Sequence, residues 1–298
     1  MTSPCTTTSD ITLYLRNRIV ELHTQGHHGT ARKYATLLSN LRAYLGRRPW
    51  PLGSTSRLLI QAFADYLLSR GITRNTLSSY LRPLRALLRR AWRDDLLVYD
   101  NRWFADVYTG IDTTSKRAIS DNDLKAVFTL DLAASPRLAL ARDALRFSFH
   151  ARGMAFVDLA HLTSGNISDG RLVYARHKTG QLLNIAIDPV MRAILHRYAD
   201  TGSPYLFPFL RGTSGYESAL RCYNYHLRQI SRKALCSRTI SSYAIRHTWA
   251  TRAIRMHVPV SVISAGMGHT SERTTRIYLD TIFDPRIDEA NTLVTDLG

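Results

Sequence analysis

The stretch Ile240 to Ile282 holds three short clusters in this order: Ser-Ser-Tyr243-Ala-Ile-Arg246-His247-Thr-Trp-Ala-Thr, Gly266-Met-Gly268-His269-Thr-Ser and Arg276-Ile-Tyr278-Leu. His269 follows Arg246 by 23 residues, and Tyr278 follows His269 by nine. An arginine fork binds two phosphate oxygens at once, and a tyrosine hydroxyl among cationic neighbours becomes a nucleophile. An arginine and a tyrosine are therefore residue types that chemistry on a phosphate group can use. Each also has a structural alternative: Tyr278 as a core aromatic, Arg246 as the partner of a surface acid, and His269 as a helix cap.

A β-hairpin is predicted upstream of these clusters, between Arg171 and Ile187. Leu172-Val-Tyr and Leu182-Leu-Asn-Ile-Ala-Ile read as strands, and His177-Lys178-Thr179-Gly180 between them suits a turn. Helical patterns resume after the hairpin and continue to the end of the chain. A lysine in such a turn can protonate a leaving oxygen, although Lys178 taken alone is also an ordinary turn residue.

The first third of the chain reads as a bundle of helices. Apolar residues recur at spacings of three and four from Leu77 to Ala91, which predicts a helix with one buried stripe and a bend at Pro83. Its other faces carry Arg82, Arg85, Arg89 and Arg90. Further helices are predicted up to Leu45 and over 56–69. The arginines favour a bundle that contacts a phosphate backbone, and a charged face in water is the alternative.

The domain division follows from where the periodicity fades. Between about Leu97 and Arg117 no helical pattern persists, and Thr113 to Arg117 is polar and basic. We therefore predict a helical domain over 8–96, a linker over 97–117 and a second domain over 118–298.

The charge of the chain points to a polyanionic partner. Its 298 residues include 40 Lys and Arg against 23 Asp and Glu, a formal net charge of +17. Such an excess favours nucleic acid as the partner, whereas a merely basic protein or one that binds acidic lipid is the alternative. The three cysteines have no metal-ligand spacing, the first residues lack the pattern of a secretion signal, and no apolar run reaches about 18 residues. We therefore expect the protein to lie in a reducing cytoplasm, associated with the nucleoid, and to make no contact with a membrane.

The ordered clusters resemble the catalytic end of the tyrosine recombinase (phage integrase) family, whose pattern is His-x-x-Arg-His, then Gly-His, then a nucleophilic Tyr. This resemblance implies a mainly α fold with a small antiparallel β-sheet: a helical, SAM-like core-binding bundle and a mixed α/β catalytic domain that close as a clamp on duplex DNA. It implies a site-specific recombinase that cleaves and rejoins DNA strands through a covalent 3′-phosphotyrosine at Tyr278. Arg246 would bind the phosphate, His269 would donate a further hydrogen bond, and Lys178 would protonate the leaving oxygen.

The same resemblance implies the partners of the chain. Neither a metal nor another cofactor is required, because the phosphotyrosine ester keeps the energy of the broken bond. Double-stranded DNA with specific recombination sites is the substrate, and four copies act on two paired sites through a Holliday junction, with accessory DNA-bending proteins as further partners. Similar tails dock on a neighbouring copy, a role that we expect for the amphipathic stretch Ile287 to Leu293.

Two positions depart from the family pattern. Tyr243 stands where the first histidine is usual, and its hydroxyl can still donate or accept a hydrogen bond. The first arginine is absent: in Arg152-Gly-Met-Ala155-Phe-Val-Asp158, Asp158 falls on the family's acidic position and Ala155 on the arginine. This variant resembles a Bacteroides-type subgroup of integrases. We expect either Arg152, one helical turn from Ala155, or Arg176, on the same strand face as Lys178, as the substitute.

Rival functions remain open on the sequence alone. Val260 to Leu279 can pass for a helix-turn-helix, which would make the chain a DNA-binding regulator without catalysis. The missing arginine is also compatible with a decayed recombinase. A monomeric enzyme that relaxes supercoils with the same nucleophile is a further rival.

Overall fold

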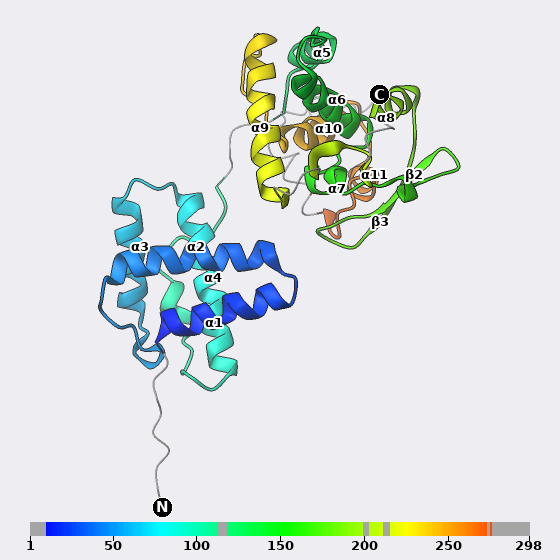
Figure 1. Cartoon of the computed structure of the whole chain (residues 1–298). Coiled ribbons are helices and arrows are strands. Elements are labelled where there is room, and N and C mark those ends of the chain that lie inside the picture. Colours follow the sequence, from blue (N-terminus) through cyan, green and yellow to red (C-terminus); the bar gives the residue numbers. More distant parts are fainter. Residues whose placement is uncertain (1–9, 113–117, 199–202, 211–214, 273–274, 276–298) are drawn as a thin grey trace, which may run out of the picture. The chain divides into compact units, whose positions relative to one another are not determined.

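The chain folds into two compact units, Met1–Thr114 and Ser115–Gly298, in the computed structural model (Figure 1). The structure describes residues 10–112, 118–198, 203–210, 215–272 and 275. Each unit has its own apolar core, so each is described by itself.

The first unit is a bundle of α-helices, as predicted. Its helices are α1 (Ile11–Thr24), α2 (His28–Leu45), α3 (Arg57–Ser69) and α4 (Arg74–Arg93), with short 3₁₀ turns at Leu52–Ser54 and Asn101–Phe104. The stripe from Leu77 to Ala91 is buried against the other helices. α4 continues through Pro83 without a break in its helical assignment.

The segment that we expected to be the beginning of the linker belongs to the first unit. Trp103 and Phe104 are buried in the core of the bundle, and Leu97 joins them. Farther along, the Ser78 hydroxyl donates to the Gly110 carbonyl at 2.7 Å. The prediction of a linker over 97–117 is therefore wrong for 97–112. Aromatic anchors on an irregular backbone hold this segment, and such anchors leave no periodicity in a sequence.

The second unit combines helices with a small sheet. In chain order it contains α5 (Asp121–Thr129), α6 (Pro136–His150), α7 (Phe156–Ala160), β1 (Ile167–Ser168), β2 (Arg171–Ala175), β3 (Leu182–Ala186), α8 (Pro189–Tyr198), α9 (Gly215–Lys233), α10 (Ala244–Arg255) and α11 (Val260–Gly266). The strands form one antiparallel sheet in the order β1-β2-β3, with Val173 opposite Asn184. The predicted hairpin and its turn are confirmed.

Helix α6 lies at the centre of this unit and packs against α8, α9 and α10. A separate small cluster holds α11 on α10, through Ala250, Ile254, Ile263 and Met267. This packing brings the end of α11 next to the first turns of α10. Within the described residues, no helix combines the length and the apolar character needed to cross a membrane.

Candidate active site

Arg246 is the centre of the candidate site. It is the third residue of α10, and only 3% of its surface is exposed. Its guanidinium donates to the Gly153 carbonyl at 3.0 Å and to the Met267 carbonyl at 2.5 Å. The same Nη2 lies 2.9 Å from Nε2 of His269. These bonds hold a permanently charged group rigidly between the α6–α7 connection and the end of α11.

His269 follows directly on this turn and is uncharged at neutral pH. Burial and then the charges of Arg246, Arg176 and Lys178 lower the pKa of the imidazole from 6.5 to about 4. Because arginine has no acceptor, Nε2 must accept the bond from Arg246. Nδ1 therefore carries the proton and donates it to the Thr275 hydroxyl, 2.8 Å away. Thr275 is fully buried and had no sequence signal that marked it as a partner.

The β2–β3 turn brings a second guanidinium to the same place. Arg176 is 7% exposed, and its Nη1 donates to the Gly268 carbonyl at 2.6 Å. Lys178, two residues later, is exposed. We expected both side chains on one strand face, but β2 ends at Ala175, so strand alternation no longer applies at these residues. One side chain enters the protein and the other faces water.

Asp158 supplies the buried carboxylate of the site. It is 4% exposed, and its Oδ1 accepts a hydrogen bond from the His177 backbone N–H at 2.8 Å. Burial raises the pKa of this carboxyl, while that hydrogen bond and then Arg176 act in the opposite direction. The acidic position recognised in the sequence thus ties α7 to the turn that carries Arg176 and Lys178.

Arg152 does not lie one helical turn from Ala155. α6 ends at His150 and α7 begins at Phe156, and between them Arg152 and Gly153 have φ angles of 59° and 69°. The chain is left-handed at both residues, which breaks the helix that our expectation required. A Cβ on Gly153 would lie 2.9 Å from the Arg246 Cα, so this turn must pass close to α10.

The remaining predicted site residues are more peripheral or fall outside the described part. Tyr243 immediately precedes α10, is 49% exposed, and packs the edge of its ring against His247 with centroids 4.8 Å apart. Tyr278 and the stretch Ile287 to Leu293 lie outside the described residues.

Comparisons with known proteins identify the family of the chain. The phage integrase SAM-like domain matches residues 10–103, and the phage integrase family matches residues 144–283. The chain belongs to the tyrosine recombinase (phage integrase) family. Tyrosine recombinase XerD of Pseudomonas aeruginosa is 23% identical, over 84% of this chain and 85% of that protein.

The solved structures of two integrases share the fold of this chain. The Tn1549 transposon integrase in complex with a circular intermediate DNA has a TM-score of 0.70 at 16% identity, over 97% of this chain and 99% of that one. A lambda integrase tetramer bound to a Holliday junction has a TM-score of 0.69 at 15% identity, over 91% of this chain and 78% of that one.

The arginines expected to contact DNA in the first unit lie on α4 and are already engaged with the protein itself. Arg82 donates to the carbonyls of Thr109 and Gly110, and Arg85 reaches the Thr109 hydroxyl at 3.4 Å. Arg89 lies over the Tyr99 ring. Arg90 is paired with Glu21 at 3.2 Å and Asp94 at 3.7 Å. Their role in DNA binding remains a prediction.

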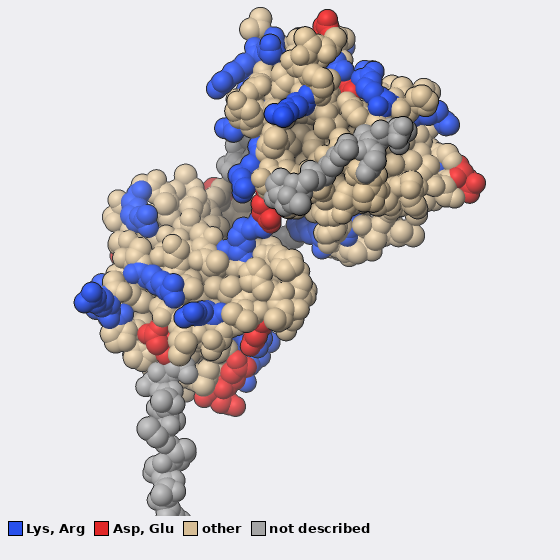
Figure 2. Space-filling view, in the orientation of Figure 1, with Lys and Arg blue, Asp and Glu red and all other residues tan. Residues whose placement is uncertain are grey.

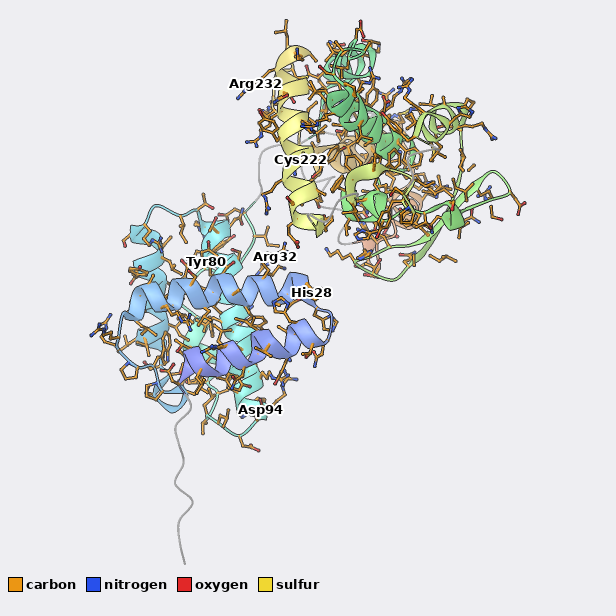
Figure 3. All side chains as sticks on the ribbon, in the orientation of Figure 1. His28, Arg32, Tyr80, Asp94, Cys222 and Arg232 are labelled. Carbon is orange, nitrogen blue, oxygen red and sulfur yellow. The ribbon has the colours of Figure 1, made fainter. Side chains whose placement is uncertain are left out.

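The sequence analysis missed a second basic helix face, on α9. Four exposed side chains recur there at helical spacing: Arg221, Tyr225, Arg228 and Arg232. Arg228 lies over the Tyr225 ring at 6.0 Å, and Figure 3 shows Arg232 on the outer side of the helix. Lys and Arg side chains are spread over both units in Figure 2. This face could have been predicted from the sequence, because the three arginines are spaced by seven and four residues and so fall on one side of a helix.

Proposed function

We propose that the chain is a site-specific DNA recombinase that cleaves and rejoins strands through a 3′-phosphotyrosine at Tyr278. The observation that carries this proposal is the buried Arg246, held beside His269 and next to the turn with Lys178. One carboxylate, Asp158, faces two buried guanidiniums there, so the site has an excess of positive charge. A phosphodiester is the ligand that such a site favours.

The reaction needs no net redox change and no added energy source. Tyr278 releases its phenolic proton to solvent as its oxygen attacks phosphorus. The bond from phosphorus to the 5′ oxygen breaks, and that oxygen leaves as a hydroxyl with a proton from Lys178. Arg246 stabilises the charge that builds on the non-bridging oxygens. Neutral His269 keeps the Arg246 fork oriented through the bond to its Nε2. Rejoining runs through the same steps in reverse, with the 5′ hydroxyl as the attacking group.

Duplex DNA is the proposed partner of both units. The exposed arginines of α4 and α9 would contact phosphates, and these contacts carry affinity rather than sequence preference. Family membership supports a tetramer on two paired recombination sites, with accessory DNA-bending proteins, acting on the nucleoid in the cytoplasm. A lambda integrase with this fold forms a tetramer bound to a Holliday junction.

A trapping experiment tests the function. A nicked duplex that carries the target site loses a short fragment after cleavage, so the covalent complex accumulates and is seen on a denaturing gel. We expect a covalent band with the wild type and none with Tyr278→Phe, which keeps the ring and removes the nucleophile. Tight binding of both proteins to the target without a covalent band would favour a DNA-binding regulator or a decayed recombinase instead.

A further inference from the structure

Ala155 leaves the candidate site one phosphate-binding group short. The family pattern puts its first arginine at this position, and a methyl group cannot contact a phosphate oxygen. A single guanidinium, Arg246, would then face a transition state that carries charge on more than one oxygen. The chain offers two arginines close by, Arg152 and Arg176, and their surroundings differ.

Arg152 lies among apolar side chains of α10 and α11. Its Cδ is 3.6 Å from the point where a Cβ on Gly266 would stand. Together with Trp249, Ala253 and Val262 it lines a pocket of about 570 Å³ whose walls are mostly apolar. The charges that lower the pKa of His269 are those of Arg246, Arg176 and Lys178.

Arg176, in contrast, binds the same short backbone segment after α11 as Arg246 does. The two guanidiniums donate to consecutive carbonyls, Arg246 to Met267 and Arg176 to Gly268, immediately before His269. Both side chains are more than nine-tenths buried. The Nε–H of Arg176 has no hydrogen-bond partner among the described residues. An unsatisfied buried N–H is costly, and a bound phosphate oxygen would satisfy it.

The backbone at Gly268 is shaped to admit Arg176. The residue has a φ of +63°, and a Cβ there would lie 2.9 Å from the Arg176 Cδ and 3.2 Å from the Leu183 Cδ1. Any side chain at 268 would therefore displace the arginine. The glycine of the Gly-His pair thus fits a guanidinium that arrives from the hairpin.

We propose that Arg176 is the second guanidinium that binds the scissile phosphate, in place of the arginine absent at Ala155. This inference rests on the proposed recombinase function. Arg176 and Arg246 then hold the non-bridging oxygens while the Tyr278 oxygen bonds to phosphorus and Lys178 protonates the departing 5′ oxygen. One turn, residues 176–180, supplies both a phosphate clamp and the proton donor, so the same short segment positions the two groups.

Covalent trapping of Arg176→Ala, Arg176→Lys and Arg152→Asn tests the assignment. Asparagine tolerates the left-handed backbone at 152, so that variant removes the charge with little strain. We expect cleavage to be about 100- to 1,000-fold slower in Arg176→Ala, with a smaller loss in Arg176→Lys, and to change less than about threefold in Arg152→Asn. Normal cleavage by Arg176→Ala, or a large loss in Arg152→Asn alone, would overturn the proposal.

A neutral substrate separates a phosphate contact from a structural role. In a methylphosphonate, a methyl group replaces one charged oxygen at the scissile position, so a second clamp has less charge to stabilise. We expect the deficit of Arg176→Ala relative to the wild type to shrink at least about tenfold on this substrate. An equal deficit on both substrates would show that Arg176 only supports the fold. Because one preparation cuts both substrates, the ratio does not depend on the fraction of folded protein.

Rescue at the family position gives an independent measurement. Ala155→Arg in the Arg176→Ala background should recover part of the lost cleavage rate, and it should not do so in an Arg246→Ala background. If the wild type forms no band that depends on Tyr278, the recombinase function itself fails. A Tyr278-dependent band with no effect of Arg176→Ala contradicts only the role of Arg176.

Discussion

The arginines of α4 and those of the candidate active site show two uses of one residue type. On α4 they lie at the surface, and their partners are backbone carbonyls, an aromatic ring or nearby acids. In the site Arg176 and Arg246 are buried, and consecutive carbonyls fix their direction. An exposed arginine can move to meet a phosphate and contributes little to the fold. A buried one is held in place before the substrate arrives, as transition-state stabilisation requires.

The largest effect should come from the most buried of these arginines. We expect Arg246→Ala to slow covalent complex formation by at least about 1,000-fold. It should also lower the free energy of unfolding by about 2–4 kcal/mol, because the carbonyls of Gly153 and Met267 lose their donor. Suicide-substrate kinetics and urea unfolding measure the two effects. Arg255→Ala, at the exposed end of the same helix, is the control and should change neither by much.

A smaller effect is expected when a new side chain crowds Arg176 without removing its guanidinium. Gly268→Ala removes no charged residue but puts a Cβ 2.9 Å from the Arg176 Cδ. We expect cleavage to slow by about 10- to 100-fold, because misplacement of a catalytic group is costly. Gly170→Ala is the matched control, since Gly170 also has a positive φ, +70°, but has open space around it. It should lose about 1 kcal/mol of stability and keep its cleavage rate. Equal cleavage rates in the two variants would contradict the role given to Gly268.

On the exposed helix the effects should be on binding. Arg82→Ala should weaken DNA affinity by about three- to tenfold and reduce the salt slope by about one. Arg90→Ala should have the smaller effect, because Glu21 and Asp94 already offset its charge. Titrations at several salt concentrations give both quantities. The cleavage rate at saturating protein should stay within about twofold of the wild-type rate in both variants. A large fall in that rate would contradict the distinction between arginines of α4 that act on binding and buried arginines that act on cleavage.

The last expected effect is on pH-dependent stability. The pKa of His269 is about 4 in the folded chain, against 6.5 for a free histidine. Between these values the unfolded chain binds a proton that the folded chain does not, so the free energy of unfolding falls as the pH drops from 6.5 toward 4. His269→Gln should show a shallower fall over this range in urea titrations at stepped pH. Parallel curves for the two proteins would mean that the imidazole is not buried beside the guanidiniums.

The sequence was sufficient to predict the helices and strands with strong periodicity, and the order of its clusters was sufficient to indicate the family. The α4 stripe and the hairpin with Lys178 in its turn were predicted correctly. The packing of 97–112 was not, because single anchors such as Trp103 leave no repeating pattern. The positions of the Arg152 and Arg176 side chains depend on two backbone features: left-handed residues at 152 and 153, and a strand that ends at Ala175. Tertiary contacts decide such features, so local propensity does not reveal them.

The turn between β2 and β3 has a consequence for how such chains diverge. Surface turns ordinarily tolerate insertions and deletions, because their residues contact little else. Here the Gly180 N–H bonds back to the Arg176 carbonyl at 2.7 Å, while the Arg176 side chain bonds to the end of α11. One added or lost residue would shift both the arginine and Lys178 out of register. We therefore expect active relatives with alanine at the first-arginine position to keep this turn at constant length, with the arginine and the lysine in place, while its other residues vary.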